Sequence, residues 1–191
     1  MCEWWNPSKG SSRLPGESSP RLRRPMASAL VATRMTENRH VAVHLNPIWR
    51  YRADHVIQAR IPESEGHHIQ LEQLWAKRIE DHVFDIRCIP FHLYDLALGD
   101  RVHTNAALEL VGVIQRSGHV TYRVWFGDQP ASRAEVENAV LGLGGSVEWS
   151  GSDLMAIDAP DKAISQAIAD YLFAQQQIAR LVYETGDKTP R

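Results

Sequence analysis

The sequence predicts an α+β protein in which a strand-rich N-terminal unit, a small barrel or a curled sheet, continues directly into a ferredoxin-like βαββαβ unit. Two observations predict this fold. Short runs in which apolar and polar residues alternate, the period of a half-buried strand, follow one another over 39–118. Over 119–187, strand-like runs alternate with two segments of helical period.

The first 38 residues differ in composition from the rest of the chain. They are rich in Ser, Pro, Gly and Arg and show no sustained hydrophobic period, which is typical of a segment that cannot bury itself. We therefore expect 1–38 to be a disordered tail or an extension of the gene model, with Met26 and Met35 as alternative starts.

The strand-rich unit contains six runs with strand-like alternation. The expected strands are 40–47, 55–62, 69–79, 82–91, 101–104 and 108–116. The dipeptide Glu80-Asp81 is expected to turn the chain between the third and fourth strands. Residues 92–98 are expected to form one helical turn.

In the ferredoxin-like unit, residues typical of turns and helix ends separate the elements. A Ser-x-x-Glu capping box at 132–135 opens the first helix, and a Gly-Gly pair at 144–145 ends it. A Gly-Ser turn at 151–152 indicates a hairpin, and Pro-Asp at 160–161 opens a second helix. The expected strands are 119–126, 146–150, 153–158 and 179–184, and the apolar stripe of the second helix is Ile164, Ala167, Ile168, Tyr171 and Leu172.

Two helices can cover only one face of this four-stranded sheet. Thr121, Arg123 and Trp125 alternate on the other face of its first strand, so that face needs a cover. The strand-rich unit is the natural candidate, because no linker separates it from this strand. The alternative is that the three side chains stack against one nucleic-acid base.

The junction of the two units, "RSGHVTYRVWF" at 116–126, allows three interpretations. Ser117-Gly118 has the composition of a two-residue hairpin turn. Arg116, Ser117 and His119 can instead form a recognition edge that presents a guanidinium, a hydroxyl and an imidazole to a partner. Ser117 with His119 can also form a catalytic pair, although the strand-to-helix elbow of many serine hydrolases is absent.

Five runs, "EQLWAKRI", "CIPF", "LALGDRV", "VIQRSGHVTYRV" and "DLMAIDAP", together resemble an uncharacterised bacterial family, domain of unknown function 4265. The similarity covers about residues 69–184, and its most specific element is the Arg-Ser-Gly-His-x-Thr stretch at 116–121. The chain departs from the family pattern ahead of residue 69. The resemblance implies no activity.

Composition, charge and the lack of certain motifs indicate which kinds of partner are not expected. The formal net charge is -2, so no global field attracts a polyanion, and no nucleic-acid partner is expected. Neither a metal nor a cofactor is expected, because the nine histidines lack metal-ligand spacing and no phosphate-binding glycine motif occurs. Two distant cysteines and the lack of a long apolar run favour a cytoplasmic protein with no membrane partner.

These observations favour a non-catalytic bacterial binding or regulatory module, comparable to an immunity protein, that recognises a protein or a small ligand. No catalytic residue is assigned. The residues expected to contact the partner are Arg116, Ser117, His119, Arg123 and Trp125. The alternative function is a small hydrolase or transferase that uses His119 with Ser117.

Overall fold

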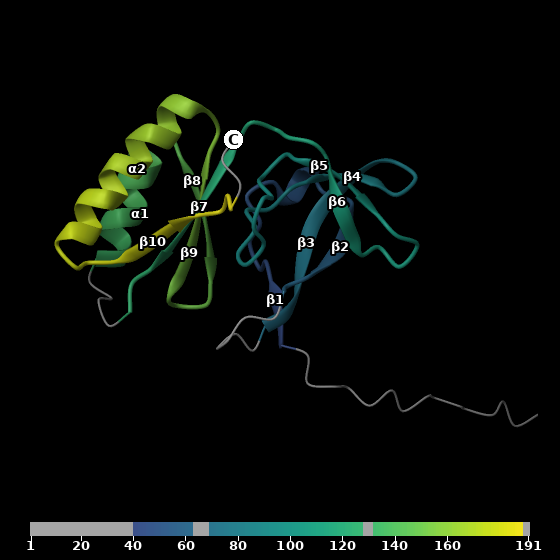
Figure 1. Cartoon of the computed structure of the whole chain (residues 1–191), viewed down its shortest axis with the longest axis horizontal. Helices are drawn as coiled ribbons and strands as arrows, with labels where there is room; N and C mark the ends of the chain where they lie inside the picture. The colour runs from purple at the N-terminus through teal and green to yellow at the C-terminus, as the bar shows by residue number, and fades with distance from the viewer. Residues whose placement is uncertain (1–39, 63–68, 128–131, 189–191) are drawn as a thin grey trace, which may run out of the picture. The chain divides into compact units, whose positions relative to one another are not determined.

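Two β-sheets and two α-helices make up the described part of the chain, which is therefore α+β with strands predominating (Figure 1). The computed structural model describes residues 40–62, 69–127 and 132–188. All of them fall within the unit Thr36–Arg191. The tail expected at 1–38 lies outside the described residues.

The first sheet has six strands and is organised around the long strand β3. The strands are β1 (His40–Val43), β2 (His55–Arg60), β3 (Ile69–Glu80), β4 (Val83–Ile86), β5 (Arg101–Thr104) and β6 (Leu110–Gln115). Their order is β1-β3-β4-β5-β6, and β2 also pairs with β3. β1 lies parallel to β3, whereas the other ladders are antiparallel. All six strands predicted from alternation are present.

The first sheet curls but does not close into a barrel, so the barrel form of the prediction is wrong. β2 pairs with β3 along its whole length, but a single bridge, Gln58 with Glu109, joins it to the segment that leads into β6. A closed barrel needs a continuous ladder between its first and last strands. The buried core of this curled sheet contains Ile57, Ala59, Leu74, Ala76, Phe84, Ile86, Cys88, Leu93, Leu96 and Val102.

The second sheet and its helices follow the predicted β-α-β-β-α-β order. The elements are β7 (Val120–Trp125), α1 (Arg133–Gly142), β8 (Ser146–Ser150), β9 (Leu154–Ala159), α2 (Lys162–Gln177) and β10 (Val182–Thr185). The strand order is β10-β7-β9-β8, and each neighbouring pair is antiparallel. Both helices cover the same face (Figure 1), where Val140 of α1 and Leu172 of α2 share a buried core with Val124.

The other face of the second sheet is covered by residues from the first half of the chain. Thr121 Oγ1 donates to Leu96 O (3.4 Å), and the Arg123 guanidinium donates to Leu93 O. Trp125 packs against a cluster whose buried members are Ala42, Ile89, Phe91, Leu154 and Ala156. The predicted cover of this face is confirmed.

Ser117-Gly118 does not form the predicted hairpin turn. β6 belongs to the first sheet and β7 to the second, so the strands that flank this dipeptide do not pair with each other. Gly118 does adopt the left-handed conformation that favours glycine, with φ of 89°. The dipeptide thus directs the chain from one sheet into the other.

The helical turn predicted for 92–98 is also wrong, since this segment consists of bends, a turn residue and irregular backbone and contains no helix. Side chains from outside the segment bind its backbone N–H groups and hold another conformation. Asp100 accepts from Ala97 N–H at 3.0 Å, and Glu72 accepts from His92 N–H at 2.9 Å.

The two helices begin in different ways. Asp161 caps α2 by accepting hydrogen bonds from two backbone N–H groups of the first turn. Ser132 precedes α1 without a side-chain cap, so the predicted capping box is wrong; its hydroxyl instead donates to Arg180 O at 3.5 Å. Neither helix of the described segments combines the length and the apolar character needed to cross a membrane.

Candidate functional site

A deeply buried polar cluster joins Glu72 of β3, His44 just after β1, and Glu148 of β8. His44 Nδ1 lies 2.7 Å from Glu148 Oε2, and His44 Nε2 lies 3.0 Å from Glu72 Oε1. None of the three residues is more than 4% exposed. Because each ring nitrogen faces a carboxylate oxygen, His44 carries a proton on both nitrogens and is an imidazolium.

Backbone donors complete this Glu72–His44–Glu148 cluster. Glu148 Oε1 accepts from two backbone N–H groups, both at 2.9 Å, and Glu72 accepts from two others, at 2.7 and 2.9 Å. The four donors are Ile48, Ile89, Phe91 and His92. Two buried carboxylates are thus stabilised by one imidazolium and four amides, which fastens two loops to β3 and β8.

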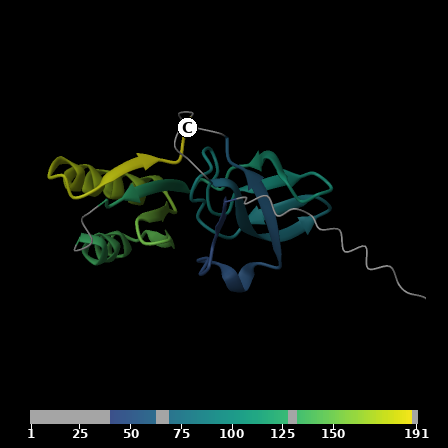
Figure 2. The same ribbon diagram turned by 90° about the horizontal axis from the view of Figure 1, so that it is seen from below.

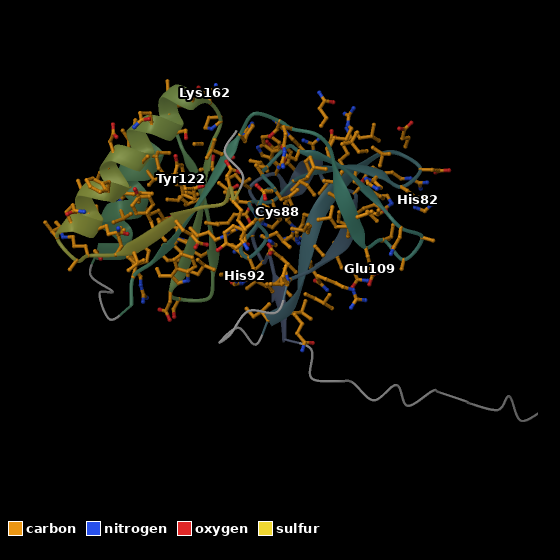
Figure 3. The ribbon with its side chains drawn as sticks, viewed as in Figure 1. His82, Cys88, His92, Glu109, Tyr122 and Lys162 are labelled. Carbon is orange, nitrogen blue, oxygen red and sulfur yellow. The ribbon has the colours of Figure 1, made fainter. Side chains whose placement is uncertain are left out.

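Burial and hydrogen bonding shift the pKa values of His44, Glu72 and the neighbouring Cys88. Burial lowers the pKa of His44, but interactions with Cys88 and the two carboxylates outweigh it and raise that pKa to about 12. Burial alone raises the pKa of Glu72, yet hydrogen bonds from His44 and the backbone bring it below its usual value. Burial raises the pKa of the Cys88 thiol, which lies in the interior (Figure 3). The cluster is enclosed, and its imidazole and carboxylate groups all have hydrogen-bond partners within the fold.

A second cluster, around the buried side chain of Asp100, holds the junction between the sheets. Asp100 Oδ1 accepts from Ser117 N–H at 2.6 Å, and Oδ2 lies 3.3 Å from Arg116 Nη1. Arg116 also donates to Asp95 O. The Ser117 hydroxyl donates to Leu98 O at 2.7 Å. Two of the residues expected to contact a partner therefore also fix the backbone of the junction.

His119 pairs with an acid from β9. Its Nδ1 lies 2.8 and 3.0 Å from the two carboxylate oxygens of Asp158. The hydrogen bond with Asp158 raises the pKa of His119, and burial raises the pKa of Asp158. The hydrogen bond between Ser117 and His119 runs from the His119 backbone N–H to Ser117 Oγ at 3.2 Å. Since the hydroxyl proton of Ser117 goes to Leu98 O, the imidazole does not activate this serine in the structure.

Arg123 and Trp125 lie on the covered face of β7. Arg123 is 1% exposed, and its Nη1 donates to Glu184 at 3.0 Å while the guanidinium lies 4.4 Å from the Tyr94 ring centroid. The structure thus brings Arg116, Ser117 and His119 together and places Arg123 in the interior. Partner binding by the five residues stays a prediction.

A third cluster lies at the surface, and sequence reasoning missed it. It consists of Trp49, Arg50, Tyr51 and Arg52, here called the 49–52 surface. The Arg52 guanidinium carbon lies 5.2 Å from the Trp49 ring centroid and 5.3 Å from that of Tyr51, which is 79% exposed. Arg50 lies 5.3 Å from the Trp75 ring centroid. Cation–π contacts therefore orient both guanidinium groups.

Backbone hydrogen bonds give the 49–52 surface a defined shape. Its arginines begin and end the short 3-10 helix η1 (Arg50–Arg52), the dark-blue turn that projects from the strands in Figure 2. The N–H groups of Arg50 and Arg52 donate to Pro47 O (3.1 Å) and Trp49 O (2.9 Å). His119 meets Trp49 edge-on, with 5.9 Å between ring centroids. The predicted recognition edge therefore borders the 49–52 surface.

Neither Arg50 nor Arg52 forms an ion pair within the described residues; their partners there are aromatic rings. The sequence signal is the run Trp-Arg-Tyr-Arg two residues after a proline, in a stretch that lacks regular alternation. No group of three or more His, Cys, Asp or Glu side chains in the described segments is arranged to hold a metal ion.

The fold and these clusters define a two-sheet α+β protein. The model of the family described as "Domain of unknown function (DUF4265)" matches residues 72–182, so the chain belongs to this family and the predicted resemblance is confirmed. The 49–52 surface precedes the matched range. No curated protein matches the chain.

A solved structure shares the fold. It is described as "Novel crystal structure of a hypothetical protein from Neisseria gonorrhoeae". It is similar to this chain with a TM-score of 0.58 at 20% sequence identity, over 69% of this chain and 94% of the other.

Proposed function

We propose that this protein is a non-catalytic binding or regulatory module that recognises a protein partner through the 49–52 surface and the adjoining edge at Arg116, Ser117 and His119. The observation that carries the proposal is the exposed Arg52 guanidinium, which lies 5.2 Å from the ring centroid of Trp49 and 5.3 Å from that of Tyr51 and forms no ion pair with any described residue. Tryptophan, tyrosine and arginine are the residues most enriched among interface hot spots.

The shape of this surface supports recognition. Contacts with aromatic rings restrict the Arg52 side chain, and the hydrogen bonds of η1 restrict the backbone, before a partner binds. Restriction in the free protein lowers the conformational entropy lost on binding. The interior clusters offer no comparable site, because Glu72, His44 and Glu148 already bond to one another and to the backbone.

Site-specific photocrosslinking in the bacterial host tests this proposal. With p-benzoylphenylalanine in place of Tyr51, we expect a discrete crosslinked product. The matched control is Phe173 on α2, an aromatic side chain that is 55% exposed and lies outside the proposed surface. No product at Tyr51, or the same products at both positions, would contradict the proposal.

A small hydrolase or transferase is the second candidate, and the His119–Asp158 pair is the observation that favours it. A histidine oriented by a carboxylate is a common general base. A panel of activated esters separates the two functions. We expect no turnover by the wild type; turnover that both Ser117→Ala and His119→Ala abolish, with unchanged melting curves, would establish catalysis.

The proposal extends to the fold and location of the protein. We assign the unit that contains β7 to β10 to the ferredoxin-like class, and the strand order β10-β7-β9-β8 with both helices on one face supports this assignment. A cytoplasmic location is supported by Cys88, a buried free thiol, since reducing compartments preserve thiols.

A further inference from the structure

We infer that the 49–52 surface binds an acidic protein segment, with carboxylates at Arg50 and Arg52 and an apolar side chain against the neighbouring face of β1. This inference rests on the proposed function and names the chemistry of the partner.

The charge of the surface calls for an anion. Arg50 and Arg52 are exposed, and their contacts within the described residues are with the rings of Trp49, Tyr51 and Trp75. A guanidinium that contacts a ring through cation–π attraction forms no hydrogen bond to it, so its N–H groups remain available to acceptors. Those donors match the two oxygens of a carboxylate.

An exposed apolar strip adjoins these arginines. Val41, Val43 and Leu45 alternate along and just beyond β1 and are 37%, 43% and 75% exposed. Val43 pairs with Gln73 of β3, which shares a face with Trp75 two residues further on. The Arg50 guanidinium lies over the Trp75 ring, so Trp75 contacts a cation of the 49–52 surface as well as the end of the apolar strip.

The contact between Trp75 and the end of β1 is direct. Trp75 Nε1 donates to His44 O at 3.0 Å, which fixes the indole beside the strip. On β2, Val56 pairs with Trp75 and is 42% exposed, which extends the apolar area. Apolar side chains beside arginine and aromatic residues are the composition of a protein-binding surface.

The same features argue against a nucleic acid as the occupant. Binding of a phosphate backbone depends on many cationic contacts, whereas this surface offers two arginines that have no acidic partner among the described residues, and the chain carries a net charge of -2. The aliphatic side chains of Val43 and Leu45 contribute nothing to phosphate binding, but they match an apolar side chain of a peptide.

Selection from a random-peptide phage library on the purified full chain tests this chemistry. We expect enriched sequences with net negative charge and at least one aromatic or large aliphatic residue. Enrichment of neutral or basic sequences, or no enrichment, would overturn the inference.

Charge reversal then locates the site with a synthetic peptide of enriched sequence. We expect Arg52→Glu to raise the Kd by about tenfold or more, and Lys162→Glu to change it by less than about twofold. Lys162 begins α2 (Figure 3), is exposed, and undergoes the same change of charge. Equal losses for the two variants would overturn the site, and equally tight binding of oligothymidylate would overturn the class of partner.

The outcomes separate this inference from the proposed function. A specific crosslink at Tyr51 without selection of acidic peptides overturns the inference alone, and the proposed function stands. Failure of both experiments overturns both.

Discussion

The Glu72–His44–Glu148 cluster and the 49–52 surface use cations in opposite ways. In the first, the imidazolium meets carboxylate oxygens at 2.7 and 3.0 Å and all three side chains are buried. In the second, guanidinium groups meet aromatic rings at 5.2 to 5.3 Å and remain exposed.

Burial accounts for the difference. A charge removed from water is tolerated only when opposite charges and hydrogen bonds replace its hydration, so the inner cluster has every polar group engaged. An exposed cation keeps its hydration and can stay unpaired at little cost. The inner cluster therefore stabilises the fold, whereas the outer surface retains donors for a partner.

Removal of the inner cation should have the largest effect. In His44→Leu, Glu72 and Glu148 lose their shared counter-ion while they remain buried, and we expect the free energy of unfolding to fall by about 3–5 kcal/mol. Urea denaturation measures this loss.

His55→Leu is the matched control for that prediction. His55 bonds to Asp54 at 2.7 Å near the surface, with its side chain 34% exposed, and we expect a loss below about 1 kcal/mol. Equal losses for the two histidine variants would contradict the distinction between buried and exposed pairs.

The stability of the fold should depend on pH through His44. Its pKa is raised from 6.5 to about 12 on folding, so its contribution is complete below pH 6.5 and declines as the pH rises toward 12. Between pH 7 and pH 8.5 we expect the free energy of unfolding to fall by about 1 kcal/mol per pH unit. His119, whose pKa is also raised, contributes in the same direction.

His44→Gln separates the two histidines in the same pH series. The variant should lose most of the slope and keep the part that His119 contributes. A slope identical to that of the wild type would show that His44 is not charged in the folded protein. On the acid side, the lowered pKa of Glu72 predicts a second loss of stability below its ordinary value of 4.5.

Removal of the outer cations should barely affect the fold. We expect Arg50→Ala/Arg52→Ala to change the free energy of unfolding by less than about 1 kcal/mol, because exposed cation–π contacts are weak. Urea denaturation of this double variant, in the same series as the His44 variants, measures this change. A loss as large as that of His44→Leu would mean that the 49–52 surface is a structural element.

The smallest expected effect is on the pKa of His119, which borders the 49–52 surface. In an NMR titration, His119 should show a pKa above 6.5, because its hydrogen bond with Asp158 favours the charged ring. Asp158→Asn should lower this pKa. Asp153→Asn, which removes an exposed carboxylate paired with Arg133, should leave it unchanged. No response to Asp158→Asn would contradict the observed pair.

Most elements of this fold could be predicted because their signals are local. Alternation identifies β7, and the aspartate at 161 that opens α2 acts on the first turn of its own helix. The left-handed conformation of Gly118 can likewise be expected from the residue type alone, because glycine tolerates a positive φ. Ser132 shows the limit of such signals, because its hydroxyl donates to Arg180 O, which is distant in the sequence.

The rest depends on contacts between distant residues. His44 and Glu148 are 104 positions apart, so neither suggests the other, and the bends of 92–98 depend on bonds to Glu72 and Asp100. Ser117-Gly118 is chemically suited to a hairpin, but the pairing of its flanking strands with different sheets decides otherwise. The 49–52 surface lacks periodicity, and only its exposure in the fold distinguishes it from a core segment.

The most direct test of the central claim is the Kd of the protein partner crosslinked at Tyr51, measured for the wild type and for Arg50→Ala/Arg52→Ala. If these exposed cations carry recognition, the Kd rises by about tenfold or more while the free energy of unfolding changes by less than about 1 kcal/mol. An unchanged Kd would contradict the claim and assign recognition to another part of the protein.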